Sequence, residues 1–215
     1  MDAIIDNLPR FIDAFLMTLR LLLISGAGAL VLGTIIAAMR ISPVAAFRVF
    51  ATIYTELLRN IPLTLILFFC AFVLPNLQVR FDYFTFALIG LTFYTSPFVA
   101  EAIRSGVNGV SIGQAEAARA IGLNFSQTLG SVVLPQAIRM VIPPLINVLI
   151  ALTKNTSVAG GFAVIELFAT SRQLINLNGN ATIAILLAVA VFYLIITVPL
   201  GQFAVALEKK VAVLR

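Results

Sequence analysis

The sequence predicts an all-α integral membrane protein with about five transmembrane helices. Of its 215 residues, 61% are hydrophobic and only 11% are charged, which is about half the charged fraction of a typical soluble domain. Five stretches are apolar over roughly the 20 residues that an α-helix needs to cross a bilayer. We therefore expect a single transmembrane domain over residues 1–215, embedded in lipid.

The first predicted span covers residues 16–39 and ends at Arg40. Within it, Ser25, Ala29 and Gly33 recur every four residues, so their small side chains share one helix face. A smooth face of this kind lets another transmembrane helix approach closely. We expect this span to pack tightly against a neighbour.

The second predicted span runs from about residue 47 to residue 74. Its wholly apolar part, residues 61–74, is too short to cross the membrane alone, so the helix must begin earlier. It then carries Glu56 and Arg59 three residues apart on one face, where opposite charges can neutralise each other. This pair is either a structural clamp or, with the following Asn60, part of the lining of a path.

Three further spans are predicted at residues 84–102, 132–152 and 181–206. In the first of these, Glu101 and Arg104 form another pair three residues apart, expected to be an ion pair near the cytoplasmic end. Several spans contain prolines, which predict kinks that either shape the bundle or line a path. Residues 156–180 mix apolar and charged side chains, which predicts a short helix lying at the outer interface or dipping partly into the membrane.

The odd number of spans puts the two termini on opposite sides of the membrane. Lysine and arginine concentrate on the cytoplasmic side of membrane proteins. With the C-terminus inside, the cytoplasmic side holds Lys209, Lys210, Arg215, Arg104, Arg119, Arg40 and Arg48. The opposite side then holds Arg10, Arg80, Lys154 and Arg172 together with Asp2, Asp6, Asp13 and Asp82. We therefore expect the N-terminus outside, the C-terminus in the cytoplasm, and residues 103–131 as the longest cytoplasmic loop.

The composition argues against enzyme chemistry in this chain. Histidine, the commonest general base and metal ligand, is absent, and the carboxylates are scattered. A phosphate-binding loop needs Gly-Lys followed by Ser or Thr, and no lysine here follows a glycine. The largest basic cluster is the pair Lys209–Lys210, which is too small to hold a nucleic-acid backbone. We expect no catalytic residue, no metal site and no nucleic-acid partner.

The end of the fourth span carries polar residues that are candidates for contact with a solute. Lys154, Asn155, Thr156 and Ser157 stand where the apolar run ends, close to the helix-breaking pair Gly160–Gly161. Four hydrogen-bonding side chains at such a break suit either an ordinary cap in the outer loop or the mouth of a polar cavity.

The predicted cytoplasmic loop contains one short helix. Ser111 followed by Gln114 has the spacing of a capping box, so this helix should begin near Ile112. Gly122 suits the left-handed position that ends a helix. A helix of about three turns is marginal by itself in water and needs something to pack against. It either rests on its own bundle or enters a groove on a partner.

This loop resembles the EAA loop of ABC importer permeases. The matching residues are Glu116, Ala117 and Ala118, then Gly122, then Val132, Leu134 and Pro135, with valine in place of the usual isoleucine. The wider run IGQAEAARAIGLNFSQTLGSVVLPQAIRMVIPPLINVLIALTKNTS, with ELLRNIPL and VAEAIRSGV, is similar to the polar amino-acid branch of that family (histidine, glutamine, glutamate or arginine type). RNIPL departs from the Arg-Gly-Thr-Pro that is common in this branch.

The resemblance implies a type I ABC importer permease in a bacterial inner membrane. Such a permease pairs with a second copy or with a related permease, and two cytoplasmic ATPase subunits carry the ATP and Mg²⁺, so this chain needs no cofactor of its own. An extracytoplasmic binding protein delivers the amino acid. By position, the coupling helix that contacts the ATPase subunits would include Glu116, Ala117, Ala118, Arg119, Gly122 and Leu123.

The mechanism implied by the resemblance is alternating access driven by the ATPase subunits. The alternative reading is an ion-coupled secondary transporter or a channel. Candidate residues for the substrate path are Glu56, Arg59, Asn60, Lys154, Asn155, Thr156, Ser157 and Glu166. Arg59 and Lys154 suit an acidic amino acid and favour glutamate, whereas Glu56 and Glu166 suit a basic one.

Overall fold

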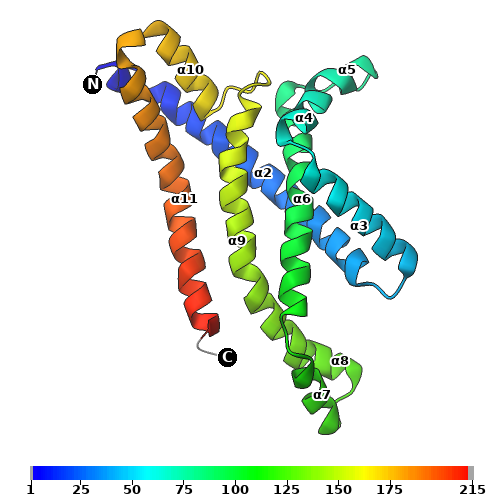
Figure 1. Ribbon diagram of the computed structural model, residues 1–215. Coiled ribbons are helices and arrows are strands. Elements are labelled where there is room, and N and C mark those ends of the chain that lie inside the picture. The colour runs from blue at the N-terminus through cyan, green and yellow to red at the C-terminus, as the bar shows by residue number, and fades with distance from the viewer. Residues whose placement is uncertain (1, 213–215) are drawn as a thin grey trace.

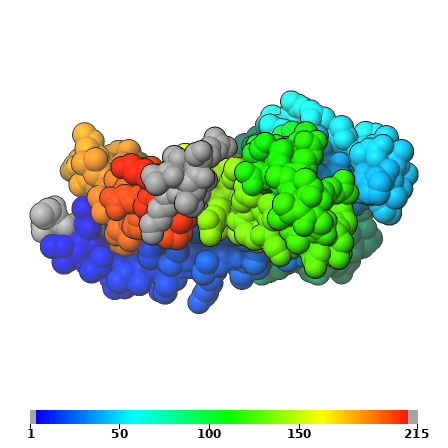
Figure 2. Space-filling model, turned by 90° about the horizontal axis from the view of Figure 1, so that it is seen from below, coloured from blue at the N-terminus to red at the C-terminus, as the bar shows by residue number. Residues whose placement is uncertain are grey.

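The computed structural model describes residues 2–212, and every regular element within that range is helical. Three long helices, α6 (Tyr83–Asn108), α9 (Leu134–Ala159) and α11 (Thr182–Ala212), lie side by side (Figure 1). The longest helix, α2 (Leu8–Ile41), crosses behind α9 and α6 and packs mainly on α6. Seen from the opposite end to the N-terminus, α2 lies along one long side of a flattened molecule (Figure 2).

The shorter elements connect these helices at their two ends. They are α1 (Asp2–Ile5), α3 (Ala45–Asn60), α4 (Leu63–Phe68), α5 (Leu74–Asn76), α7 (Ile112–Ala120), α8 (Phe125–Thr128), α10 (Leu167–Leu177), two π-helical turns (Phe69–Val73 and Leu129–Val133) and a 3-10 turn (Gly179–Ala181). Within residues 2–212, four helices are long and apolar enough to cross a membrane, or five if a bent pair counts as one span. The prediction of about five spans is thereby confirmed.

The second predicted span is the bent pair, and the kink expected at its proline, Pro62, is a sharp corner that divides the predicted helix into two. α3 ends at Asn60, and the helical segment that starts at Leu63 turns away from it by 99°. Pro62 lacks a backbone N–H and forces the preceding Ile61 into extended backbone, with ψ of 132°. Apolar composition measures the length of a span but not its straightness, so hydropathy alone could not locate this corner.

Most helices also extend beyond their predicted spans. α2 begins at Leu8 rather than near residue 16, and α9 continues to Ala159 rather than ending near residue 152. The reason is that apolar composition identifies only the part of a helix that lies in hydrocarbon, while hydrogen bonding continues into the interface. The short helix predicted between the last two spans is confirmed as α10.

The small residues of α2 allow it to lie directly against α6. Ser25, Ala29 and Gly33 are all buried, as their four-residue spacing predicted. A β-carbon added at Gly33 would lie 2.6 Å from the β-carbon of Val99 and 2.7 Å from the backbone carbonyl oxygen of Ser96. Because one of these neighbours is backbone, only glycine permits so close a contact at this crossing.

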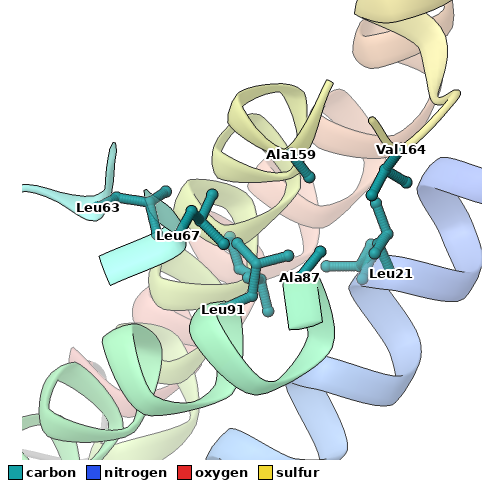
Figure 3. Close-up of a cluster of buried hydrophobic side chains, with 9 residues drawn as sticks. Leu21, Leu63, Leu67, Ala87, Leu91, Ala159 and Val164 are labelled. Atoms are coloured by element: carbon teal, nitrogen blue, oxygen red, sulfur yellow. The ribbon is translucent and has the colours of Figure 1, made fainter. Parts of the chain in front are cut away.

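A buried apolar cluster joins α2, α4, α6 and α9 (Figure 3). Its members are Leu21, Leu22, Leu63, Leu67, Ala87, Leu91, Leu152, Ala159 and Val164. The cluster attaches both the bent second span and the chain after α9 to α6. Leu152 also lines the cavity described below, so the same packing fixes one wall of that cavity.

Both π-helical turns end just before a proline, Pro75 in one case and Pro135 in the other. In the second turn the Leu134 N–H donates to the carbonyl oxygen of Leu129, five residues earlier. A proline ring in a regular helix clashes with the carbonyl four residues before it, and a widened turn relieves that clash. Pro135 therefore lies within a continuous helical path from α8 into α9 instead of breaking it.

Candidate functional site

The predicted coupling helix, α7, lies at the end of the molecule opposite the N-terminus and α10 (Figure 1). Ser111 occupies its N-cap position, but the predicted capping box is absent there because the Ser111 side chain makes no cap hydrogen bond. A capping box forms instead at the start of α8, where Asn124 and Gln127 bond each other's backbone N–H groups. The capping box therefore fixes the first residue of α8, the helix that follows α7, and not the first residue of α7.

Gly122 ends α7 as predicted, in left-handed backbone with φ of +91°. The N–H of Gly122 donates to the carbonyl oxygen of Arg119 at 3.0 Å, and the N–H of Leu123 donates to that of Ala118 at 3.1 Å. These two bonds constitute a Schellman motif, which satisfies carbonyl groups at the end of a helix. The length of α7 is therefore set by the backbone conformation of one glycine.

The outer surface of α7 and α8 is uncovered. Within α7, Ala118 is the buried residue, while Glu116, Ala117 and Arg119 are exposed. Large apolar side chains at both ends of α7 and at the start of α8 are also exposed, with exposed fractions of 76% for Ile112, 80% for Ile121 and 67% for Phe125. Exposed apolar side chains grouped around a short polar helix are typical of a protein contact surface.

A cavity of ≈ 400 Å³ lies between α6 and α9. Its wall residues are Tyr94, Thr95, Phe98, Asn147, Val148, Ala151, Leu152 and Asn155. The Thr95 hydroxyl is buried and has no hydrogen-bond partner among the described residues. The cavity therefore combines an apolar wall with a few polar groups able to bind a solute, which is the usual composition of a small-molecule site.

Of the predicted path residues, Asn155 alone lines this cavity. The others that contribute to it, Tyr94, Thr95, Phe98 and Asn147, were not singled out from the sequence. Asn147 and Asn155 are eight residues apart with Ala151 midway, so the three share one side of α9. This spacing of two amides within a strongly apolar helix was a signal that the sequence did contain.

Arg59 contacts Phe98, one of the wall residues of this cavity. Its guanidinium lies over the Phe98 ring, 5.6 Å from the ring centre, which is a cation–π contact. Of the two roles left open for Glu56 and Arg59, the structure gives no support to the clamp, since the ion pairs of the described residues do not include these two. Asn60 donates from its side chain to the backbone carbonyl oxygen of Glu56. Thus a positive charge, rather than a neutral pair, stands beside the cavity.

The predicted ion pair between Glu101 and Arg104 is confirmed, and a third residue joins it. Arg104 donates to the Glu101 carboxylate at 2.5 Å, and Arg40 at the end of α2 donates to it at 2.6 Å. Glu101 lies one turn beyond Phe98 on α6. The arrangement ties α2 to α6 directly beneath the cavity.

The polar group at the end of the fourth span lies within α9, because the helix continues to Ala159. Lys154 is exposed, whereas Thr156 is buried and donates to the carbonyl oxygen of Thr153 at 2.7 Å. Ser157 donates to the carbonyl oxygen of Lys154 at 2.7 Å. The break predicted at Gly160–Gly161 is confirmed, but the helix before it continues past residue 152 and places these side chains on different sides of α9.

Glu166 is fully buried and caps the N-terminus of α10. Its carboxylate accepts hydrogen bonds from the N–H groups of Phe168 at 2.9 Å and Ala169 at 2.7 Å, and from the Tyr193 hydroxyl at 2.9 Å. Burial raises the pKa of the Glu166 carboxyl, and these donors only partly oppose that effect. The surroundings of Glu166 are those of a structural cap that joins α10 to α11.

Comparison with known proteins agrees with this geometry. The family model described as "Binding-protein-dependent transport system inner membrane component" matches residues 29–213. The chain belongs to this family. Its members are membrane components of transport systems, so the role of this chain is that of a membrane permease. Among the side chains of residues 4–209, which the structure describes, no group of three or more is suited to hold a metal ion.

Individual relatives include permeases of amino-acid transporters. The chain is 42% identical over 217 residues to the glutamate transport system permease protein GluC of Corynebacterium efficiens, covering 95% of each chain. It is 42% identical over 205 residues to the probable glutamine ABC transporter permease protein GlnM of Bacillus subtilis, covering 95% of this chain and 94% of that one. A solved amino acid ABC transporter crystallised with histidines has a TM-score of 0.88 at 26% identity, covering 96% of both chains. The MetNI methionine ABC transporter, at 19% identity and a TM-score of 0.74, supports the fold alone.

Proposed function

We propose that this permease imports glutamate, or a closely similar polar amino acid, by alternating access driven by two cytoplasmic ATPase subunits. The ATPase subunits carry ATP and Mg²⁺, an extracytoplasmic binding protein delivers the amino acid, and a second copy or a related permease completes the path. The N-terminus lies outside and the C-terminus in the cytoplasm. The names of the relatives support glutamate or glutamine as the transported solute.

The observation that carries the coupling is the uncovered surface of α7. Glu116, Ala117 and Arg119 are exposed, and the apolar Ile112 and Ile121 flank them without any cover from the bundle. A ligand shifts a conformational equilibrium only by binding one state better than the other. The ATPase subunits therefore bind α7 differently when ATP closes them. The resulting movement of α7 passes through α8 into α9, which lines the cavity.

The solute passes beside the cavity between α6 and α9. The amides of Asn147 and Asn155 and the unpartnered hydroxyl of Thr95 supply both donors and acceptors for an α-amino acid. Arg59, behind Phe98, adds positive charge to this wall and favours an anionic side chain. At the mouth, Lys154 is exposed and Ser157 is half-buried, whereas Thr156 is fully buried and takes no part.

The test is ATP-driven uptake of radiolabelled L-glutamate by proteoliposomes containing the permease, its ATPase and its binding protein. Asn155→Leu should lower uptake roughly tenfold, as expected for loss of one hydrogen bond to a charged solute, with the complex still assembled. Asn180→Leu, which changes an exposed asparagine outside the cavity, should transport normally. Uptake that needs no ATP and collapses with an ionophore would support the secondary-transporter alternative instead.

A second comparison tests the charge preference. Arg59→Gln should lower uptake of glutamate more than uptake of glutamine, because it removes a charge while keeping a polar side chain. Equal loss for both solutes would assign Arg59 a packing role against Phe98 rather than a role in selecting the solute.

A further inference from the structure

A second cavity, of ≈ 650 Å³, lies between the first turns of α2 and helix α10. It lies at the end of the molecule that carries the N-terminus, and the coupling helix α7 lies at the opposite end (Figure 1). None of its wall residues is shared with the cavity between α6 and α9. The proposed transport function makes no use of it.

The polar wall of this cavity lacks partners among the side chains that the structure describes, those of residues 4–209. Within that range, Arg10 and Asp13 stand three residues apart on α2 but form no ion pair. Gln173 and Asn176 on α10 extend exposed side chains that make no hydrogen bond to any described residue. Thr170 is 3% exposed, and its buried hydroxyl has no hydrogen-bond partner in the described part of the chain. A ligand with both donors and acceptors would replace water at the four exposed side chains, and the Thr170 hydroxyl is the buried group of this wall that still lacks a partner among the described residues.

The position of the cavity matches the level of lipid headgroups. α10 connects α9 to α11, both of which are apolar enough to span a membrane, so it lies where the hydrocarbon layer ends. Arg10 is in the first turn of α2, and Met17 lies about 10 Å further along the helix at 1.5 Å per residue. Ionic groups therefore lie at the mouth, while Met17 and Ile165 form an apolar wall.

We propose that this cavity binds the headgroup of a zwitterionic phospholipid that carries a primary ammonium group. The Arg10 guanidinium binds the phosphate through paired N–H donors. The Asp13 carboxylate and the side-chain carbonyls of Gln173 and Asn176 accept hydrogen bonds from the ammonium. Met17 contacts the apolar part of the lipid next to its headgroup.

The same geometry discriminates among lipids. A headgroup with phosphate alone brings no cation for Asp13 and is repelled by it. A quaternary ammonium brings the positive charge but has no N–H to donate to Asp13, Gln173 or Asn176. A free amino acid carries both charges but lacks the acyl chains that follow the apolar wall at Met17 and Ile165.

The experiment is native mass spectrometry of the full-length permease, purified in detergent with its copurifying subunits. Phosphatidylethanolamine, phosphatidylcholine and phosphatidylglycerol are added at equal concentration. We expect phosphatidylethanolamine to bind roughly tenfold more tightly than the other two, as one lost charge-assisted hydrogen bond implies. Arg10→Gln should remove most of this binding, and Asp13→Asn should abolish the preference over phosphatidylcholine.

Arg172→Gln is the matched control, because Arg172 is an exposed arginine on α10 that does not line the cavity. It should leave phosphatidylethanolamine binding unchanged. Equal retention of the three lipids, or unchanged binding in both Arg10→Gln and Asp13→Asn, would overturn the proposal. Displacement of the lipid by millimolar L-glutamate would also overturn it, by assigning the cavity to a soluble zwitterion.

Discussion

The Schellman motif at Gly122 offers a direct test of how α7 is coupled. A β-carbon at this position would meet no atom within 4 Å, so the β-carbon itself creates no steric clash. A substitution acts through the backbone, because φ is +91° and residues that carry a β-carbon disfavour left-handed backbone. Gly122→Val and Gly122→Asn therefore probe one variable, the conformation that ends the helix.

The expected magnitude follows from the cost of left-handed backbone, which is ~1–2 kcal/mol for a residue with a β-carbon. Since a helix as short as α7 is marginal alone, the loop of the Gly122→Val permease relaxes out of this conformation. Binding to the ATPase must then restore it, which weakens the equilibrium constant about five- to thirtyfold. Asparagine tolerates the left-handed region, so Gly122→Asn should be affected less.

The assay measures the affinity of the purified permease for its ATPase, followed by ATP-driven uptake in proteoliposomes. Gly130→Ala is the matched control, because Gly130 also has open space around it but no positive φ. We expect affinity to decrease in the order wild type and Gly130→Ala, then Gly122→Asn, then Gly122→Val. Thermal unfolding of the membrane bundle should be the same in all four. If Gly122→Val binds and transports like wild type, the left-handed stop is not needed for coupling.

Three further predictions concern the bundle itself. Gly33→Ala should lower the free energy of unfolding by about 1–3 kcal/mol through overpacking against α6, and Val99→Ala should restore it only in part, as followed by thermal unfolding in detergent. Glu101→Gln should cost about 1–2 kcal/mol, because it leaves Arg40 without its carboxylate in a partly exposed site, and the double variant with Arg40→Gln should cost little more than either single one. For Glu166 the raised pKa means that folding favours the protonated carboxyl, so its contribution to stability is fully present below the ordinary pKa of 4.5 and is lost as the pH rises through the raised value. Unfolding measured against pH should therefore show the wild type gaining stability relative to Glu166→Gln as the pH falls through that window, and parallel curves would contradict this origin of the pKa shift.

The features that could be predicted from the sequence are those set by local composition. The spans follow from apolar length, because lipid requires every backbone group to be paired within the segment. The close approach of α2 to α6 follows from the spacing of Ser25, Ala29 and Gly33, and the end of α7 follows from Gly122. Each of these depends on a few neighbouring residues whose physical requirements do not change with the rest of the fold.

The features that escaped prediction depend on how separate elements meet. A kink was expected from Pro62, but hydropathy could not show that it is a corner of 99°, because the two arms are apolar enough to span only when they are taken together. Charge spacing suggested that Arg59 would pair with Glu56, but tertiary packing turned it towards Phe98 on another helix. The cavity needed α6 and α9 side by side, and Thr95 became significant only when its hydroxyl was found buried without a partner.

The position of Asn147 supports the proposed pairing of two permease chains in the membrane. It is exposed on α9, in the middle of a helix that is apolar enough to span. An amide facing hydrocarbon without a hydrogen-bond partner costs several kcal/mol, so lipid is an unfavourable neighbour for this side. Ala151 and the exposed Lys154 lie on the same side of the helix, and Lys154 would add a larger penalty. This side of α9 is therefore stable only against water or protein, which is what a path enclosed with the proposed second permease would supply.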